Sequence, residues 1–410
     1  MQLHHNIKQI SAAVVFGCFS IVWIWWISHS YAKPSKLNTE RDSNRFTQAT
    51  DTIRMTIGFV GDIMAHITQV KAQKVNDTTY DFNDNFQLMK PLFTPIDLMI
   101  GNLETVFGGS GIAYSTHPRF NTPDALAAAL RDAGFDLLST ANNHMMDQGI
   151  EGMKRTISVI RNHAMNSTGS RLSSDELRYF VQTIQGIKIS IAAFTYESDR
   201  VKGEVLINGL KIKKDDKLLV NSFTPFNLQD ATDSLRIVTN AMMADSSELQ
   251  VMIMHWGDEY KTKPNTVQQA LADSLRKMGI DIVLGSHPHV IQPVVFERDP
   301  IQGKDFLVAY SSGNFISNHR FETKGNYYTE DGLFVVVEIE KIGEAKPRLK
   351  AVNTIPLWVN KYWNNGRNHF EVVPLESILN DSLSLKRFSK AQKQRMESSL
   401  KRTKEILSIK

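Results

Sequence analysis

The chain has almost no cysteine, since Cys18 is the only one in 410 residues. A single thiol excludes an intrachain disulfide and any zinc site built on paired thiolates, so a metal site would have to use His, Asp, Glu and Asn. A strong charge of either sign is also absent, because 47 basic residues stand against 43 acidic ones. The composition therefore predicts no nucleic-acid partner.

Several common enzyme motifs are missing as well. The sequence has no serine nucleophile elbow, no P-loop and no dinucleotide fingerprint, and it contains no internal repeat or low-complexity tract. What is present is an ordinary composition, with 42% hydrophobic and 22% charged residues, which is typical of a chain with a full core.

One long hydrophobic run, from Ile10 to Ile27, carries no charge and has about the length that a helix needs to cross a ~30 Å hydrocarbon layer. We expect it to anchor the protein in the cell membrane, with the main domain outside the cytoplasm. Small residues at Ser30 and Ala32 fit a signal-peptidase site, so a protein secreted or periplasmic after cleavage near Ala32 is the alternative. Residues 1–32 are thus a signal anchor or signal peptide, and residues 33–51 a polar linker.

From Asp51 onward, short apolar runs alternate with longer amphipathic ones, which is typical of an α/β domain. The early runs are apolar on both faces, as buried parallel strands are, whereas the late ones follow one another without helices. This pattern predicts two packed sheets with helices outside, and the polar segment 198–222 is expected to be an insertion or loop. Expected strands cover residues 53–60, 97–101, 135–140, 187–195, 249–255, 280–285, 292–297, 306–310 and 333–340, and expected helices cover 123–133, 150–163, 228–245 and 265–278.

The last stretch, Ser382 to Lys410, has helical spacing and a strong excess of basic residues. Its apolar stripe would comprise Leu385, Phe388, Met396, Leu400 and Leu407, with Lys386, Arg387, Lys390, Lys393, Lys401 and Arg402 elsewhere on the helix. Such a helix either packs on the domain with its basic side solvated or contacts an anionic surface or polymer.

Polar side chains gather where the apolar runs stop. The five places are Gly61-Asp62, Gly101 to Glu104, Ala141 to His144, His255 to Glu259 and Gly285 to His289. Because ligands bind beyond the carboxyl ends of the strands in open α/β sheets, we expect these five loops to converge on one pocket.

Some of these residues have a simpler explanation when taken alone. Asp62 could be a turn residue or helix cap, His144 a turn residue, and His255 a satisfied core residue. Glu104 is harder to explain, because its strand is apolar enough to be buried and a buried charge without a partner is costly. A cation beside Glu104 would offset that cost.

His287 and His289, one residue apart around Pro288, suit adjacent positions of a two-ion centre. Imidazole, carboxylate and amide oxygen without thiolate suit a divalent transition metal such as Mn, Zn or Fe. One or two ions are expected, and two ions bridged by a carboxylate would activate water for hydrolysis.

The order and content of these loops resemble a known family. The segments are GFVGDIM, IGNLE, FNTPDAL, LLSTANNHMMDQG, MHWGDEY, LGSHPHVIQPV and YSSGNF. From about Ile53 to Phe315 they resemble the CapA-type capsule-biosynthesis proteins of poly-γ-glutamate production, whose domain belongs to the metallophosphoesterase-like superfamily. The resemblance implies a four-layer α-β-β-α sandwich over residues 52–360, followed by a C-terminal extension, 361–410, with the basic amphipathic helix.

The resemblance also implies a metal site. Asp62 resembles the carboxylate of the first metal position, and Glu104 stands where a bridging carboxylate is expected. Asn143 resembles the amide ligand, while His255 and His287 would serve the second ion and His289 the first.

One position departs from the superfamily pattern, which usually has a His two residues after the first Asp. This chain has Met64 there, a poor ligand for a hard ion, and His66 lies two residues further on. A site with one ion, or a degenerate site without catalysis, therefore stays open.

Four residues are expected to act around the metals. The resemblance makes His144 the candidate general acid, and Asp147, three residues on, would orient its ring. Arg119 has the planar fork for a bidentate carboxylate contact, with an ordinary surface arginine as the alternative. Asn314 either completes a backbone turn or touches the pocket.

Two functions fit this reading. One is a metal-dependent hydrolase acting on a γ-glutamyl amide or phosphoester of an envelope polymer. The other is a non-catalytic accessory subunit that holds the polymer for its synthesis or export. Expected partners in both are an anionic envelope polymer, the membrane and membrane-embedded synthesis or export subunits.

Overall fold

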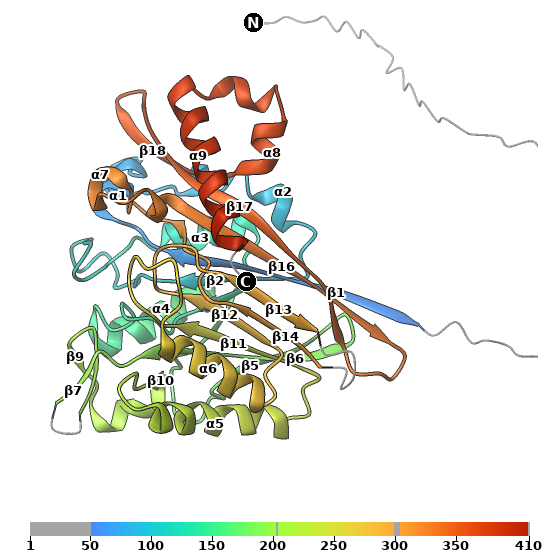
Figure 1. Ribbon diagram of the computed structural model, residues 1–410. Helices are drawn as coiled ribbons and strands as arrows, with labels where there is room; N and C mark the ends of the chain where they lie inside the picture. The colour runs from blue at the N-terminus through green and yellow to red at the C-terminus, as the bar shows by residue number, and fades with distance from the viewer. Residues whose placement is uncertain (1–50, 202–203, 299–303, 409–410) are drawn as a thin grey trace, which may run out of the picture. The chain divides into compact units, whose positions relative to one another are not determined.

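The computed structural model describes residues 51–201, 204–298 and 304–408 (Figure 1). The expected membrane segment 10–27, the cleavage point near Ala32 and nearly all of the linker 33–51 lie outside these ranges. Within them, no helix has the length and apolar character needed to cross a membrane.

The first sheet has eight strands, β1 (Thr52–Ile63), β2 (Leu98–Leu103), β3 (Leu137–Ser139), β4 (Asn166–Thr168), β15 (Asn314–Ile316), β16 (Asp331–Ile342), β17 (Arg348–Asn364) and β18 (Arg367–Pro374). They lie in the order β18-β17-β16-β1-β2-β3-β4, and β15 pairs with β1. Strands β1 to β4 run parallel to one another, whereas the pairs β1/β16, β16/β17 and β17/β18 are antiparallel.

The second sheet has seven strands, β5 (Phe180–Ile184), β6 (Ile187–Tyr196), β10 (Ser222–Phe223), β11 (Leu249–His255), β12 (Ile282–Ser286), β13 (Val294–Arg298) and β14 (Asp305–Ala309). Their order is β10-β6-β11-β12-β14-β13, with β5 beside β6. Strands β6, β11, β12 and β14 run parallel, so their carboxyl ends share one edge.

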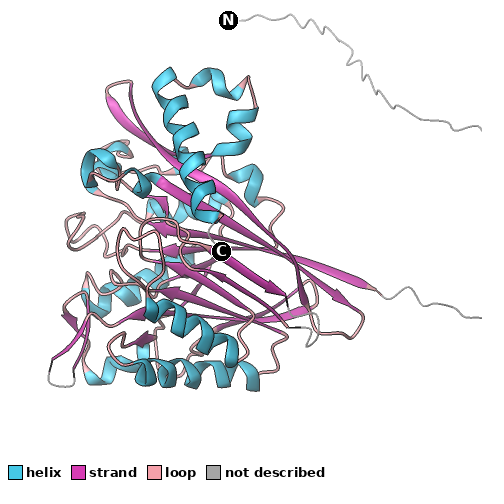
Figure 2. Ribbon diagram, in the orientation of Figure 1, coloured by secondary structure: helices cyan, strands magenta, loops and turns pink. Residues whose placement is uncertain are grey.

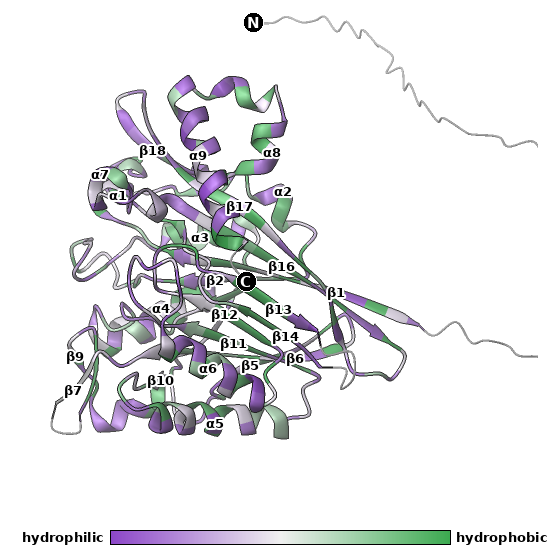
Figure 3. Ribbon diagram, viewed as in Figure 1, coloured by the Kyte–Doolittle hydropathy of each residue, from purple (hydrophilic) through white to green (hydrophobic). Residues whose placement is uncertain are grey.

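The helices are α1 (Ile67–Ala72), α2 (Lys90–Phe93), α3 (Ala125–Ala133), α4 (Gly149–Asn162), α5 (Leu228–Ala244), α6 (Thr266–Lys277), α7 (Phe321–Lys324), α8 (Leu375–Asn380) and α9 (Lys390–Leu407). Figure 2 shows α5 and α6 outside the second sheet, and other helices on the far side of the first. The strands between them are largely hydrophobic in Figure 3, as expected for sheets that are covered on both faces.

Alternation along the strands creates three core layers. Met55, Ile57 and Phe59 of β1 face the second sheet and pack in one cluster with Ile191 of β6 and Ile253 of β11. Because successive side chains point to opposite faces, the residues between them face the helices. The two sheets therefore share the central core layer.

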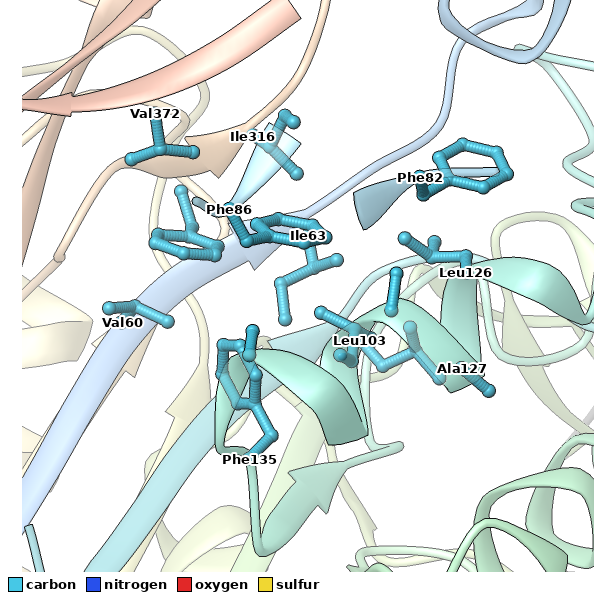
Figure 4. Packing of buried hydrophobic residues seen from close by; sticks show 14 of the residues in the cluster. Val60, Ile63, Phe82, Phe86, Leu103, Leu126, Ala127, Phe135, Ile316 and Val372 are labelled. Atoms are coloured by element: carbon cyan, nitrogen blue, oxygen red, sulfur yellow. The ribbon is translucent and has the colours of Figure 1, made fainter. Parts of the chain in front are cut away.

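The two outer faces are covered by helices. On the first sheet, Val60 and Ile63 pack with Phe86, Leu126 and Phe135 (Figure 4). On the second sheet, buried residues of β11 pack against α5 and α6 in a separate cluster that contains Met252, Met254, Leu235, Val238 and Leu271. The described chain is thus a layered α/β structure with helices, two sheets and helices in succession.

The expected strands and helices are present with small shifts at their ends, for example 249–255 as β11 and 265–278 as α6. The polar segment 198–222 is more ordered than expected, because it contains a small sheet of β7 (Asp199–Val201), β8 (Glu204–Ile207) and β9 (Leu210–Lys211). Val205 and Ile207 alternate along β8 and pack against Met145 and Met146, which gives this short strand a buried face.

The expected C-terminal helix is α9, and it packs on the domain. Phe388 and Met396 are buried with Trp358 of β17 and Val373 of β18. The expected domain boundary at residue 360 falls inside β17. Residues 361–408 therefore continue the first sheet and cover it.

Arg402 fixes α9 to the sheet through a buried carboxylate. Its Nε and Nη2 each donate to Asp331 at 2.8 Å, and Ser399 Oγ donates to the same carboxylate at 2.6 Å. Asp331 is only 1% exposed. Burial raises the pKa of Asp331 to about 6, although Arg402 and Ser399 act to lower it. Arg402 thus stabilises the packing of α9 on the first sheet.

We predict that Arg402→Met lowers the free energy of unfolding by roughly 3 kcal/mol at pH 8, because a buried charge is left without its partner. At pH 5, below the pKa of about 6, Asp331 is protonated and needs no counter-charge, so the loss should be smaller. Urea unfolding at both pH values measures this. Lys401→Met, at an exposed position of the same helix, is the control. An equal loss in both variants would contradict the prediction.

Candidate metal centre

The carboxyl ends of strands from both sheets meet at one place. Asp62 is the last residue but one of β1, and Glu104 directly follows β2. From the other sheet come His255, the last residue of β11, and the loop after β12 that carries His287 and His289. The backbone N–H of His287 points at both carboxylate oxygens of Asp62 at 3.4 Å, so the two edges are in contact.

Two glycines allow this close approach. A Cβ at Gly61 would lie 1.9 Å from the carbonyl oxygen of Gly313, and one at Gly285 would lie 2.0 Å from that of Tyr310. The segment between β14 and β15 therefore passes directly over the ends of β1 and β12. Any side chain at either glycine would displace this segment.

The first ligand group consists of Asp62, Glu104 and His289, all buried. Nδ1 of His289 lies 3.0 Å from Oδ2 of Asp62 and 3.1 Å from Oδ1 of Asn314. Asn102 donates to the other oxygen of Asp62 at 2.8 Å. The carboxylate and the imidazole are thus held by neighbouring amides.

The second ligand group consists of Glu104, His255 and His287, also buried. Oδ1 of Asn143 lies 2.9 Å from Nε2 of His255, and Oγ of Ser286 lies 3.0 Å from Nδ1 of the same ring. Within each group the potential ligand atoms lie within 4.8 Å of one another. The amide of Asn143 adds an oxygen donor beside the second group.

Glu104 belongs to both groups and has the most demanding environment. It is fully buried, and neither carboxylate oxygen has a hydrogen-bond partner among the described residues. Its Oε1 lies 3.6 Å from Nε2 of both His255 and His289. Burial, followed by the charge of Asp62, raises the pKa of Glu104 well above its usual range. A cation at this point would offset both effects and lower the pKa of Glu104.

The histidines are prepared as neutral ligands. Burial, together with neighbouring imidazoles, lowers the pKa of His255 well below its usual range and that of His287 to about 4. Below that pKa a ring is charged, so at neutral pH both rings are neutral and can offer a lone pair. Burial acts to raise the pKa of Asp62, but the hydrogen bond and charge of His289 outweigh it and the pKa is lowered.

Backbone strain marks the same loop. His287 has φ of 99° and His289 has φ of 56°, values that side-chain-bearing residues rarely adopt. Such conformations persist only where the surrounding structure imposes them, and they cluster at functional sites. Here the strain turns both imidazoles toward the carboxylates of the first sheet.

His144 and Asp147 form a pair next to the ligand groups. Nδ1 of His144 donates to Oδ2 of Asp147 at 2.7 Å, and the N–H of Phe120 donates to the same oxygen at 2.7 Å. Nε2 of His144 has no hydrogen-bond partner in the described ranges. Asp147 therefore fixes the ring of His144, as its spacing predicted.

The two residues expected to bind substrate have different surroundings. Asn314 is fully buried and donates to the carbonyl oxygens of His289 and Thr329, so it supports the site's backbone. Arg119 is exposed, and its guanidinium makes no hydrogen bond or ion pair within the described part of the chain. Its neighbour Phe120 contacts the ring of His144 edge-on, which ties this loop to the site.

Met64 is buried, and the two ligand groups do not include it or His66. The ring of His66 instead accepts from the N–H of Asn318 at 3.1 Å and packs against His319, which in turn packs against His289. Burial lowers the pKa of His66 to about 3, so this ring is neutral as well. His66 and His319 form a wall beside the first group.

Three of the supporting residues were not singled out from the sequence. Asn102 lies two residues before Glu104, so strand alternation could have placed both on one face. Ser286 lies in the expected loop Gly285 to His289 but was given no role, and Tyr196 carried no such signal. The Tyr196 ring stacks parallel to His255, with centroids 6.3 Å apart, and contacts His287, because β6 pairs with β11 in the second sheet.

The donor set fits divalent transition metals. Two buried carboxylates, three imidazoles and an amide oxygen match the ligand preferences of Mn, Zn and Fe. Both carboxylate oxygens of Glu104 and Nδ1 of His287 are buried without a hydrogen-bond partner among the described residues, as expected of metal ligands whose ion is absent.

A family model described as bacterial capsule synthesis protein PGA_cap matches residues 56–319. The chain belongs to this family. The match covers all of the loops that carry the two ligand groups.

Individual relatives agree with the family. This chain is 27% identical to the PGA biosynthesis protein CapA of Bacillus subtilis over 303 residues, covering 71% of this chain and 70% of that protein. It is 27% identical to the capsule biosynthesis protein CapA of Bacillus anthracis over 302 residues, covering 71% and 66%. A probable polyglutamine synthesis accessory protein of Mycobacterium tuberculosis is 23% identical over 284 residues, covering 65% and 67%.

We predict that Glu104→Gln stabilises the metal-free protein at pH 8 by roughly 1–3 kcal/mol, the range for an unsatisfied buried polar or charged group. The folded pKa of Glu104 is raised, so the wild type loses stability as pH rises above the unfolded pKa of about 4.3, and the Gln variant lacks that loss.

Added Mn²⁺ or Zn²⁺ should reverse the order, because only the wild type keeps the shared ligand. Urea unfolding with chelator and with metal measures both effects. Glu338→Gln, a partly exposed Glu on β16, is the control. Equal stability of wild type and Glu104→Gln in chelator at pH 8 would refute the account of Glu104.

Proposed function

We propose that this protein serves the biosynthesis or export of an anionic envelope polymer of the poly-γ-glutamate type and carries a metal-dependent hydrolytic site. The family and the relatives named for PGA and capsule biosynthesis support the polymer class. The layered sheets and the strand-end site support a metallophosphoesterase-like architecture.

One observation carries the hydrolytic part. Glu104 is fully buried without hydrogen-bond partners and is common to two potential ligand groups, so it would be available to two cations at once. Cations held there would supply Lewis acidity, polarising the scissile γ-glutamyl amide or phosphoester and making water a better nucleophile.

The chain's own residues supply positioning and a proton. Asp147 fixes the ring of His144 through Nδ1, which leaves Nε2 to donate a proton to the leaving group. Asn102 and Asn314 hold Asp62 and His289, so the ligands need little rearrangement when metal binds.

The location belongs to the same proposal. Residues 10–27 would anchor the protein in the cell membrane, with the described domain outside the cytoplasm beside membrane-embedded synthesis or export subunits. Cleavage near Ala32 would instead release it. The apolar composition of 10–27 supports both forms.

A second candidate is a non-catalytic accessory subunit that holds the polymer. Met64 favours it, since this position offers no hard ligand and leaves the first group with three residues. The relative named as a synthesis accessory protein points the same way.

The test measures metal content and turnover together. We predict that the full chain, purified without chelators, binds about two equivalents of transition metal, and that Glu104→Ala loses them. His144→Asn should keep the metal and lower kcat on a γ-glutamyl amide or a phosphodiester by roughly 100- to 10,000-fold, the usual contribution of a general acid.

His163→Asn, at the end of α4, is the matched control and should keep full activity. Wild-type protein with metal but no turnover on either substrate would favour the accessory function. Wild-type protein that binds no metal would overturn the site.

A further inference from the structure

A polar cavity that none of the metal ligands lines lies at the edge of the first sheet. Its volume is about 350 Å³, and it is lined by β4, by the loop that follows β4 and by the start of β5. Three arginines line it, Arg161, Arg171 and Arg178. None of them was expected to have a function from the sequence.

Only one of the three arginines pairs with a carboxylate. Arg161 pairs in bidentate fashion with Glu176, the acidic residue that lines the cavity, at 3.0 and 2.6 Å. Asp175 is exposed in the same loop but does not line the cavity. Two guanidinium groups, those of Arg171 and Arg178, therefore face the cavity without a counter-charge.

A single neutral amide holds these two cations together. Oδ1 of Asn221 accepts from Nη1 of Arg171 at 3.1 Å and from Nε of Arg178 at 2.9 Å. Asn221 is fully buried, and its own Nδ2 donates to the carbonyl of Arg178 at 2.8 Å, so its orientation is fixed. An amide oxygen orients two guanidinium groups but cannot neutralise them.

Donors remain free inside the cavity. Arg171 is only 3% exposed, and its Nε has no hydrogen-bond partner in the described chain, while Ser167 Oγ is likewise buried and unpartnered. Neither terminal nitrogen of half-buried Arg178 bonds to a described residue. Burial and the charge of Arg178 lower the pKa of Arg171 to about 10, which reflects the same missing anion.

The cavity is connected to the metal centre through the loop that follows β3. β4 runs parallel to β3, so both strands end at the same edge of the sheet. Thr140, which follows β3, bonds Ser170 Oγ at 2.7 Å and the carbonyl of Thr168 at 3.0 Å. Asn143 lies three residues further along the same loop as Thr140.

We propose that Arg171, Arg178 and Ser167 form a carboxylate-binding subsite. It holds one carboxylate of the polymer while another part of the same polymer molecule reaches the metal centre. The planar fork of Arg178 suits a carboxylate in bidentate geometry, with Arg171 and Ser167 as further donors. The polymer as the source of the carboxylate rests on the proposed function, whereas the subsite itself does not.

The experiment measures binding of three probes to the full chain by calorimetry at low salt: glutarate, a γ-linked glutamate oligomer and inorganic phosphate. Arg178→Gln should weaken glutarate and oligomer binding by roughly ten- to a hundredfold, because two charge-assisted hydrogen bonds are lost, and should leave metal content unchanged. Arg178→Lys keeps the charge without the fork and should weaken binding less. It carries the test if Arg178→Gln does not fold.

Arg236→Gln, which removes the same charge from an exposed ion pair on α5, is the matched control and should bind as the wild type does. Unchanged binding in Arg178→Gln, or no binding of any probe by the wild type, would overturn the subsite. Tighter binding of phosphate than of glutarate would overturn its carboxylate preference. Glutarate binding that depends on Arg178, without oligomer binding, would support the subsite and contradict the polymer as its source.

Discussion

The structure of this site depends on one buried carboxylate. Glu104 sits where the edges of two sheets meet, and neither of its carboxylate oxygens has a hydrogen-bond partner among the described residues. A charge in such a place is tolerated only if a cation accompanies it or if it takes up a proton. His255 and His287 are too deeply buried to carry that positive charge at neutral pH, which favours a bound cation as the partner of Glu104.

The fold explains why Glu104 can occupy this position. Parallel strands place their carboxyl ends at one edge, and packing two such sheets brings the edges together. The central core between them is apolar, which fixes their distance, and Gly61 and Gly285 let the segment 310–313 pass close to the ends of β1 and β12. Ligands from separate sheets are thus positioned by the same packing that stabilises the protein.

Much of this arrangement was predictable from the sequence, and the reason is periodicity. The apolar runs that end in Asp62, Glu104 and His255 gave both the strands and the point at which each stops, so convergence followed from the geometry of parallel sheets. Whether these residues act as metal ligands stays a prediction. The supporting residues were harder to find, because Ser286 and Tyr196 contact His255 only through the pairing of β12 and β6 with β11.

Short edge strands were beyond what the sequence could indicate. β4 is only three residues long, Asn166–Thr168, and no apolar pattern distinguishes it from a loop. Its role comes from pairing with β3. The segment 198–222 shows the same limit, since β8 gains its buried face from Met145 and Met146, residues more than fifty positions away in the chain. Tertiary contacts decide such elements, and local propensity does not.

The metal centre and the arginine-lined cavity carry opposite charges, and this limits which substrates fit both. The ligand groups at Asp62 and Glu104 concentrate negative charge, whereas Arg171 and Arg178 concentrate positive charge, and the loop through Thr140 joins the two places. A molecule carrying many carboxylates finds a favourable partner at the first site only when cations are present there. Under the proposed function, metal loading therefore favours the approach of the polymer as well as the cleavage of its bond, and the arginines would determine which part of the polymer lies beside the metals.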